Sequence, residues 1–309
     1  MTRVVVYRAG LLTTIQDEGR WGHQAAGVPV SGPMDGWSHR LANLLVGNGR
    51  DAPTLEVTAT GPDLRFEGPA MIAIAGARFA GEIDDRRWTS PVVVEARAGS
   101  RLTFGARQHG LRAYIAAGGG FDAPLVLGSR ATDVRSRLGG LAGRPLRDGD
   151  SLRVLGTAHA SRSVPPDAGW MLSAEPCRLR IMRGPEPGRA AEEAYEALLS
   201  SVFTVSPRSD RMGYHLAGAS VPIDAAPRIS APVATGVVQV PPAGAPVLLM
   251  SDRQTTGGYA AVAAVITADL PRAGQLGPGD HLAFDACEAD AALLALIASE
   301  RTLLALEGR

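Results

Sequence analysis

The chain has 309 residues and carries 31 basic and 31 acidic side chains, so its formal net charge is zero. All the basic residues are arginines, because the sequence contains no lysine. This excludes sites on this chain that need a lysine ammonium: a Walker-type phosphate loop, a Schiff base or a biotinylated carrier. Neutral charge without a basic cluster argues against nucleic-acid binding, and no apolar run reaches the roughly 18 residues of a membrane span.

The cysteines and histidines give no sign of a metal site. Cys177 and Cys287 do not have the spacing of metal ligands or of a CxxC pair. The six histidines form no HxH, HxxxH or HExxH pair, so we predict no metal held by histidine nitrogen. The N-terminus lacks the apolar core of a signal peptide, and together these observations predict a cytoplasmic protein with reduced cysteines.

Short runs rich in Val, Ile, Leu and Thr predict most of the secondary structure, because they are bounded by Gly, Pro and Asp. In chain order the expected strands are residues 4–7, 55–59, 71–75, 92–95, 101–104, 111–116, 152–155, 179–182, 237–240, 247–250, 261–267 and 281–284. Apolar and polar residues alternate over 55–60, which predicts a strand with one buried face. Helices are expected at 34–46, 187–200 and 288–299, the first with Ser31 or Asp35 near its start. Few helices among many strands predict a mainly β fold rather than a doubly wound α/β fold.

A glycine-led motif recurs three times and suggests the domain organisation. It begins at Gly99, Gly149 and Gly279, and in each case a strand follows the turn. Two of the three copies close one half of the chain, and a chain of this length favours two domains. We therefore predict two similar β-rich domains, residues 1–163 and 164–309. In the alternative, the first 60 residues pack on the second domain.

Three dense polar segments are the candidate ligand sites. They cover residues 14–22 with 27–35, residues 128–133, and residues 209–214 with 239–241 and 251–259. Each combines Arg, Asp or Gln with glycines that let the backbone approach a ligand, and each lies at a strand end. Alternatively, their Asp–Arg pairs and Asx turns tie loops together.

These segments carry a family resemblance. The strings TIQDEGRWG, GVPVSGPMD, LANLLVGN, AAGGGFD, LGSRATD, SDRMGY, QVPPAGAPV and SDRQTTGGY occur in this order. With them the chain resembles allophanate hydrolase subunit 2, also known as the KipA-type biotin-dependent carboxyltransferase family, whose stand-alone bacterial members include the C subunit of 5-oxoprolinase. The resemblance implies two tandem cyclophilin-like β-barrel domains with a few short helices. It also implies a KipI-type subunit 1 as partner and, for 5-oxoprolinases, a third subunit of the LamB/YcsF type.

The implied reaction is the ATP-dependent opening of the lactam of 5-oxo-L-proline to L-glutamate, on a complex rather than on this chain alone. ATP with magnesium is then the expected cofactor, held here or by a partner subunit. Under this hypothesis the expected anion clamps are Arg20, Arg211 and Arg253, because a guanidinium binds carboxylate or phosphate through two parallel hydrogen bonds. The expected general bases or magnesium partners are Asp17, Asp35 and Asp252. The expected substrate-binding residues are Gln16, Ser31, Gln239, Gln254, Thr255, Gly257, Gly258 and Tyr259.

Two alternatives stay open. One is a biotin-dependent carboxyltransferase component acting on urea or a related amide, with the biotin carried by another chain. The other is a regulatory KipA-like antagonist of a kinase inhibitor. The chain also departs from the family pattern at four positions: His215 stands where Arg is usual, Ala231 replaces Glu, and Ala260 and Ala261 replace Pro and often Lys.

Overall fold

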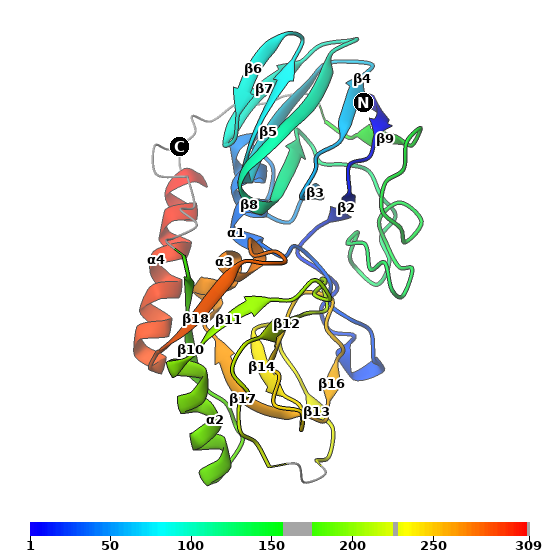
Figure 1. Cartoon of the computed structure of the whole chain (residues 1–309). Helices are drawn as coiled ribbons and strands as arrows, with labels where there is room; N and C mark the ends of the chain where they lie inside the picture. The colour runs from blue at the N-terminus through cyan, green and yellow to red at the C-terminus, as the bar shows by residue number, and fades with distance from the viewer. Residues whose placement is uncertain (157–174, 225–227, 308–309) are drawn as a thin grey trace. The chain divides into compact units, whose positions relative to one another are not determined.

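The computed structural model describes residues 1–156, 175–224 and 228–307. The chain divides into two compact units (Figure 1). Unit 1 comprises Met1–Trp21, Ser31–Met171 and Leu303–Arg309, and unit 2 comprises Gly22–Val30 and Leu172–Thr302. The domain boundary predicted between residues 163 and 164 lies outside the described residues. Two short segments, Gly22–Val30 and Leu303–Arg309, group with the unit formed mainly by the other half of the chain.

Unit 1 is built on a curled sheet of nine strands (Figure 1). The strands are β1 (Thr2–Arg8), β2 (Leu12–Gln16), β3 (Thr54–Thr58), β4 (Asp63–Phe66), β5 (Ala70–Ile83), β6 (Arg86–Thr89), β7 (Val92–Ala96), β8 (Arg101–Ala117) and β9 (Ser151–Val154). Six of them follow the order β2-β3-β8-β4-β1-β9. Strand β5 pairs with β8 on one side and with β6 and β7 on the other, and the pairings described in this sheet are antiparallel.

Both faces of this sheet are buried over much of its area. Inside the curl lies an apolar core that includes Val4, Val57, Phe66 and Phe79. Helix α1 (Gly36–Leu45) packs its apolar residues against the other face, over β5 and β8. The expectation of one buried face for residues 55–60 therefore fails at Glu56, which is 1% exposed, whereas Thr58 is half-buried and Thr60 is exposed.

Unit 2 contains a closed barrel of seven strands in the order β10-β17-β14-β15-β12-β11-β18 (Figure 1). These strands are β10 (Cys177–Arg183), β11 (Val202–Val205), β12 (Gly213–Ala217), β14 (Val237–Val240), β15 (Val247–Leu249), β17 (Ala260–Val265) and β18 (His281–Ala286). Two very short strands, β13 (Ala231–Pro232) and β16 (Thr256–Gly257), pair with each other beside it. The other elements of the chain are the helices α2 (Arg189–Ser200), α3 (Leu270–Gly274) and α4 (Ala289–Glu307) and the 3₁₀ turns η1 (Gln24–Ala26) and η2 (Thr267–Asp269).

The mainly β prediction is confirmed, and most expected strands are present. The two strands expected at 101–104 and 111–116 form one long strand, β8, whose pairing with β5 shifts register between Gly76 and Gly81. Strands β2, β4, β6, β11 and β12, each four or five residues long, were not predicted, and neither were the two-residue strands β13 and β16. In the part of the chain that the structure describes, no helix is long and apolar enough to cross a membrane.

Candidate functional site

The predicted site residues fall into two groups, one in each unit. The group in unit 1 consists of Gln16, Asp17, Arg20, Ser31 and Asp35. The group in unit 2 consists of Arg211, Gln239, Asp252, Arg253, Gln254, Thr255, Gly257, Gly258 and Tyr259. Most members of each group lie on loops next to strands, whereas Gln16, Gln239 and Gly257 lie within strands and Asp35 caps α1.

A buried ion pair supports the site of unit 2. Arg211 donates from Nε and Nη2 to the two carboxylate oxygens of Asp252, at 2.8 and 3.0 Å. The two side chains are only 7% and 8% exposed. Their backbones are also joined, since the Asp252 amide donates to the Arg211 carbonyl oxygen at 2.8 Å. The pair therefore fixes the loop that follows β15 to the loop that precedes β12.

Arg253, the next residue, is held differently. Its side chain is 6% exposed, and it donates from Nη1 to Thr235 Oγ1 at 2.6 Å and from Nε to the Val233 carbonyl oxygen at 3.3 Å. It forms no ion pair with a carboxylate among the described residues. Burial lowers the pKa of its guanidinium, and the neighbouring charge of Asp252 offsets this in part.

Arg253 thus lies near the Asp252 carboxylate, which already accepts hydrogen bonds from Arg211. A buried charge without a counterion is costly, and an anionic ligand at Arg253 would relieve that cost. The fork of the guanidinium is suited to a carboxylate or a phosphoryl group. Arg253 is therefore the strongest anion-binding candidate in unit 2.

Polar groups of the turn after Arg253 complete this site. The carbonyl oxygen of Tyr259 accepts a hydrogen bond at 3.4 Å from Nε2 of Gln239, which is 1% exposed at the end of β14. Gln254 is half-buried and the Tyr259 ring is 52% exposed. Both residues stay predicted substrate-binding residues. Ala231, one of the positions that depart from the family pattern, pairs with Gly257 and so lies directly beside this turn.

A side chain at position 257 would press against the buried amide of Gln239. A Cβ atom at position 257 would lie 2.6 Å from Gln239 Nε2, whereas at Gly258 the nearest atom is Ser230 Oγ at 3.4 Å. We expect Gly257→Ala to displace the buried amide and to lower the free energy of unfolding by about 1–3 kcal/mol, the usual cost of overpacking. Gly258→Ala is the matched control and is expected to change little. Urea denaturation of both variants measures the difference, and equal midpoints would contradict this account.

In unit 1, Asp17 and Arg20 tie the end of β2 to residues 126–131. The Asp17 carboxylate accepts from the Gly19 amide at 3.0 Å, from Ser129 Oγ at 2.6 Å and from the Arg130 amide. Arg20 is fully buried, and its Nη2 donates to the Ala131 carbonyl oxygen at 2.5 Å. Both side chains thus hold loops in place, as the alternative for the polar segments expected. Their roles as base and clamp stay predictions.

Two neighbouring side chains keep unused polar atoms. Gln16 is fully buried; its Nε2 donates to Thr132 O at 3.1 Å, while its Oε1 has no hydrogen-bond partner in the described residues. Ser31 is 6% exposed, adopts a left-handed backbone conformation with φ 57°, and its hydroxyl has no partner there either. Strained backbone of this kind is common at functional sites. Gln16 Oε1 and Ser31 Oγ are therefore the candidate atoms in unit 1 for direct contact with a ligand.

A buried network that was not predicted positions the residues after Ser31. Glu56 Oε2 accepts from the Met34 amide at 2.8 Å and from the Tyr114 hydroxyl at 2.7 Å. The Tyr114 hydroxyl in turn accepts from the Asp35 amide at 2.8 Å, and desolvation raises the pKa of this tyrosine well above 10.0. Asp35 caps α1, accepting from the Ser38 amide at 2.9 Å and from Ser38 Oγ at 2.5 Å. The only sequence signal for this network was a glutamate inside an apolar strand, which alternation assigned to solvent.

His39 on α1 is expected to make the stability of the chain depend on pH. Its ring is fully buried with Nδ1 2.9 Å from Thr54 Oγ1, and burial lowers its pKa below 6.5, although Glu18 opposes this. Below about pH 6.5 the unfolded chain binds a proton that the folded chain does not, so stability is lost as the pH falls. We expect His39→Gln to remove this slope, which is at most about 1.4 kcal/mol per pH unit. Urea denaturation across this range tests it, with the exposed His109→Gln as control; an unchanged slope in His39→Gln would contradict it.

The three predicted acids do not offer a magnesium site. All six of their carboxylate oxygens accept hydrogen bonds: those of Asp17 from Gly19, Ser129 and Arg130, those of Asp35 from Ser38, and those of Asp252 from Arg211. Among the described residues there is no group of three or more His, Cys, Asp or Glu side chains that could hold a metal ion. A magnesium ion at any of these acids would have to share the carboxylate with the protein donors that already bind it.

Residues 26–286 match the family model described as carboxyltransferase domain, subdomain A and B. The C subunit of 5-oxoprolinase from Escherichia coli (strain K12) is 38% identical over 94% of this chain and 93% of its own length. The urea amidolyase of Saccharomyces cerevisiae is 33% identical over 92% of this chain, which spans 16% of that protein.

Two solved structures are also similar. A crystal structure of TTHA0988 superposes with a TM-score of 0.84 and 36% identity, covering 92% of this chain and 55% of that one. The crystal structure of the Kluyveromyces lactis urea carboxylase superposes with a TM-score of 0.87 and 29% identity, covering 98% of this chain and 29% of that one. The chain thus spans about half, or less, of these two structures.

Proposed function

Because the chain belongs to the carboxyltransferase domain family, subdomain A and B, we propose that it is the C subunit of an ATP-dependent 5-oxoprolinase complex that opens 5-oxo-L-proline to L-glutamate. The observation that carries this proposal is the extent of the match. Two relatives named as C subunits of 5-oxoprolinase align over 93% and 87% of their own lengths, at 38% and 34% identity. The urea amidolyases align over 16% of theirs.

The chemistry of the proposed reaction fits the charge of the site in unit 2. An unstrained amide is a poor electrophile, so ATP would phosphorylate the lactam oxygen and a first water would add to the carbon. The ring C–N bond would then break, with the nitrogen leaving as the protonated amine and the carbon left as an acyl phosphate. A second water would hydrolyse this acyl phosphate to the glutamate carboxylate and phosphate. 5-Oxoproline carries one carboxylate, which the Arg253 fork can bind through two hydrogen bonds. Gln254 and Tyr259 would orient the ring. Arg211 and Asp252 act on the substrate through the loop that they fix, so we assign them as positioning residues.

ATP itself is assigned to the complex rather than to this chain. The chain lacks the lysine of a Walker-type loop, and its three candidate acids are occupied by protein donors. We propose that a partner subunit holds ATP with magnesium. The partners proposed are a KipI-type subunit 1 and a LamB/YcsF-type subunit. Both 5-oxoprolinase relatives are named as subunits, which supports an assembly in general.

Reconstitution tests this function. The chain, subunit 1 and the LamB/YcsF-type protein encoded in the same genome are purified and combined. We expect phosphate release from ATP that requires both 5-oxoproline and this chain. Glutamate should form in an amount equal to the phosphate released. The control omits one protein at a time. Equal turnover without this chain would reject a catalytic part for it and would favour the regulatory alternative.

The carboxyltransferase hypothesis is the second candidate, favoured by the family model and by the superposition with urea carboxylase. Arg253 would then bind the carboxylate of carboxybiotin. The biotin would have to arrive on another chain, because this one has no lysine. Carboxylation of urea or a related amide by the chain with a biotinylated carrier, without release of phosphate on addition of 5-oxoproline, would favour this candidate over the first.

A further inference from the structure

One edge of the sheet in unit 1 is unpaired in the described residues. Strands β6 and β7 follow each other along the same side of β5 and pair with no other described strand. An open edge of this kind is a template for another strand. Pro91, which has no N–H group, lies between the two strands, so β7 is the longer uninterrupted part of the edge.

The register shows which backbone groups of β7 point outward. Met71 pairs with Glu95, and Ala73 with Val93. The Met71 carbonyl oxygen accepts from the Gly118 amide at 2.9 Å, so the polar groups of Met71 face β8. Because hydrogen-bonded and non-hydrogen-bonded pairs alternate in an antiparallel ladder, Glu95 and Val93 also direct their N–H and C=O groups away from β5. These four groups are available to an added strand.

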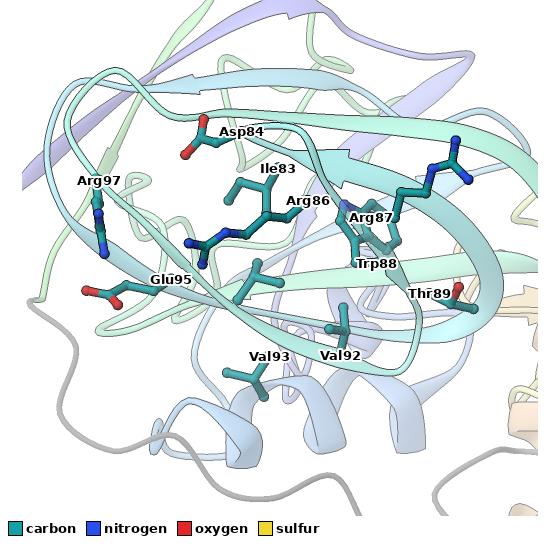
Figure 2. A pocket seen from close by; sticks show the side chains of 11 residues that line it. Ile83, Asp84, Arg86, Arg87, Trp88, Thr89, Val92, Val93, Glu95 and Arg97 are labelled. Atoms are coloured by element: carbon teal, nitrogen blue, oxygen red, sulfur yellow. The ribbon is translucent and has the colours of Figure 1, made fainter.

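A groove lies beside this edge (Figure 2). It has a volume of about 590 Å³, within the range of binding pockets. Its apolar floor includes Ile83, Trp88 and the half-buried Val92. Trp88 is 5% exposed, and its indole N–H has no hydrogen-bond partner in the described part of the chain.

The charges around the groove favour an acidic ligand. Arg86 and Arg97 are exposed and form no ion pair with any described residue, and Figure 2 shows both on the same side of the groove as Glu95. Arg87 lies 3.7 Å from Glu82. Of the two lining acids, Asp84 already accepts from the Arg101 amide at 3.0 Å. The lining is therefore positive, with two guanidinium groups free to bind carboxylates.

We propose that an extended acidic segment of subunit 1 adds to β7 as a further strand. Its backbone bonds to Val93 and Glu95, and its carboxylates bind Arg86 and Arg97. This is strand addition, in which main-chain hydrogen bonds supply affinity and side-chain pockets supply specificity. A second copy of this chain is a poorer occupant, because it would bring the same arginines to the same edge. The proposal rests on the proposed function for the identity of the partner.

Two sets of variants test the edge with purified subunit 1 as the probe. Val93→Pro removes an N–H group that points away from β5, so it leaves the internal ladder intact. We expect it to weaken the complex roughly tenfold or more, as the loss of a hydrogen bond and a steric clash would. Val93→Ala keeps the N–H group and is the control, expected to bind nearly as the parent does. Arg86→Glu/Arg97→Glu is expected to abolish binding at low salt, whereas Arg147→Glu, at an exposed arginine outside the groove, is not.

Residue-resolved hydrogen exchange gives a direct readout. On addition of subunit 1 the amides of Val93 and Glu95 should become protected, while that of Val94 should be protected already. The proposal would be overturned if hydrogen exchange at Val93 and Glu95 did not change on addition of subunit 1, or if no complex formed. It would also be overturned if Val93→Pro and the charge variants bound subunit 1 with the affinity of the parent. Self-association of the chain that Val93→Pro abolishes would overturn the choice of partner. A pair that binds through this edge but hydrolyses no 5-oxoproline would support the interface and count against the proposed reaction alone.

Discussion

Replacing Arg253 with alanine is expected to lower kcat/KM of the reconstituted complex by about 10²–10³-fold, the usual effect of removing one preorganised donor to a charged group. The physical reason is that Arg253 is a buried guanidinium with neutral hydrogen-bond partners, Thr235 and Val233, and so has charge to offer a substrate anion. Steady-state phosphate release with varied 5-oxoproline measures the effect. A rise in KM alone would indicate ground-state binding of the carboxylate, and a fall in kcat would indicate stabilisation of the transition state.

Two further variants control this experiment. Arg253→Lys keeps the charge but loses the planar fork, and an intermediate rate is expected. Arg178→Ala removes an arginine from an exposed pair with Asp285 and is expected to leave the rate unchanged. If Arg253→Ala folds, joins the complex and turns over as the parent does, Arg253 is not the anion clamp, and a regulatory role for the chain regains support.

Replacing Arg211 with methionine is expected to lower the free energy of unfolding by about 3–5 kcal/mol, because Asp252 would lose the guanidinium that satisfies both its carboxylate oxygens while remaining buried. Chemical denaturation of the isolated chain, followed by circular dichroism, measures this loss. The double variant Arg211→Met/Asp252→Leu is expected to recover most of the stability, because well-packed apolar residues can replace a buried ion pair at little cost.

The comparison with Arg178→Met separates the effect of burial from that of charge. Arg178 also forms a two-fold hydrogen bond with an aspartate of the barrel, Asp285, but its side chain is 57% exposed. Exposed ion pairs contribute little to stability, so this variant should unfold at nearly the parent denaturant concentration. Equal losses of unfolding free energy in the two variants would show that burial is not the reason why the Arg211–Asp252 pair stabilises the fold.

Local sequence patterns were sufficient to predict the strand-rich class, because strand formation follows from short apolar runs bounded by turn residues. They were insufficient at β3, where alternation marked Glu56 as exposed. Whether the second face of a strand meets water depends on which element covers that face. Here the face that carries Glu56 is covered by α1 and by the residues that precede α1. That information lies in long-range packing and not in the strand itself.

The sequence by itself determined that an anion bound by this chain must be held by arginine forks, backbone amides or a bound cation, because there is no lysine, and it located the polar turns where such binding could occur. It could not distinguish among the arginines. Asp252 and Arg253 are neighbours in the sequence, yet Asp252 bonds to Arg211, 41 residues away, and Arg253 to neutral groups. The charge that an arginine can offer a ligand depends on which carboxylates lie within a few ångströms, and only the tertiary structure brings those carboxylates near or keeps them away. The edge of β7, which is unpaired among the described strands, was decided in the same way, by the strands that lie beside it and not by its own residues.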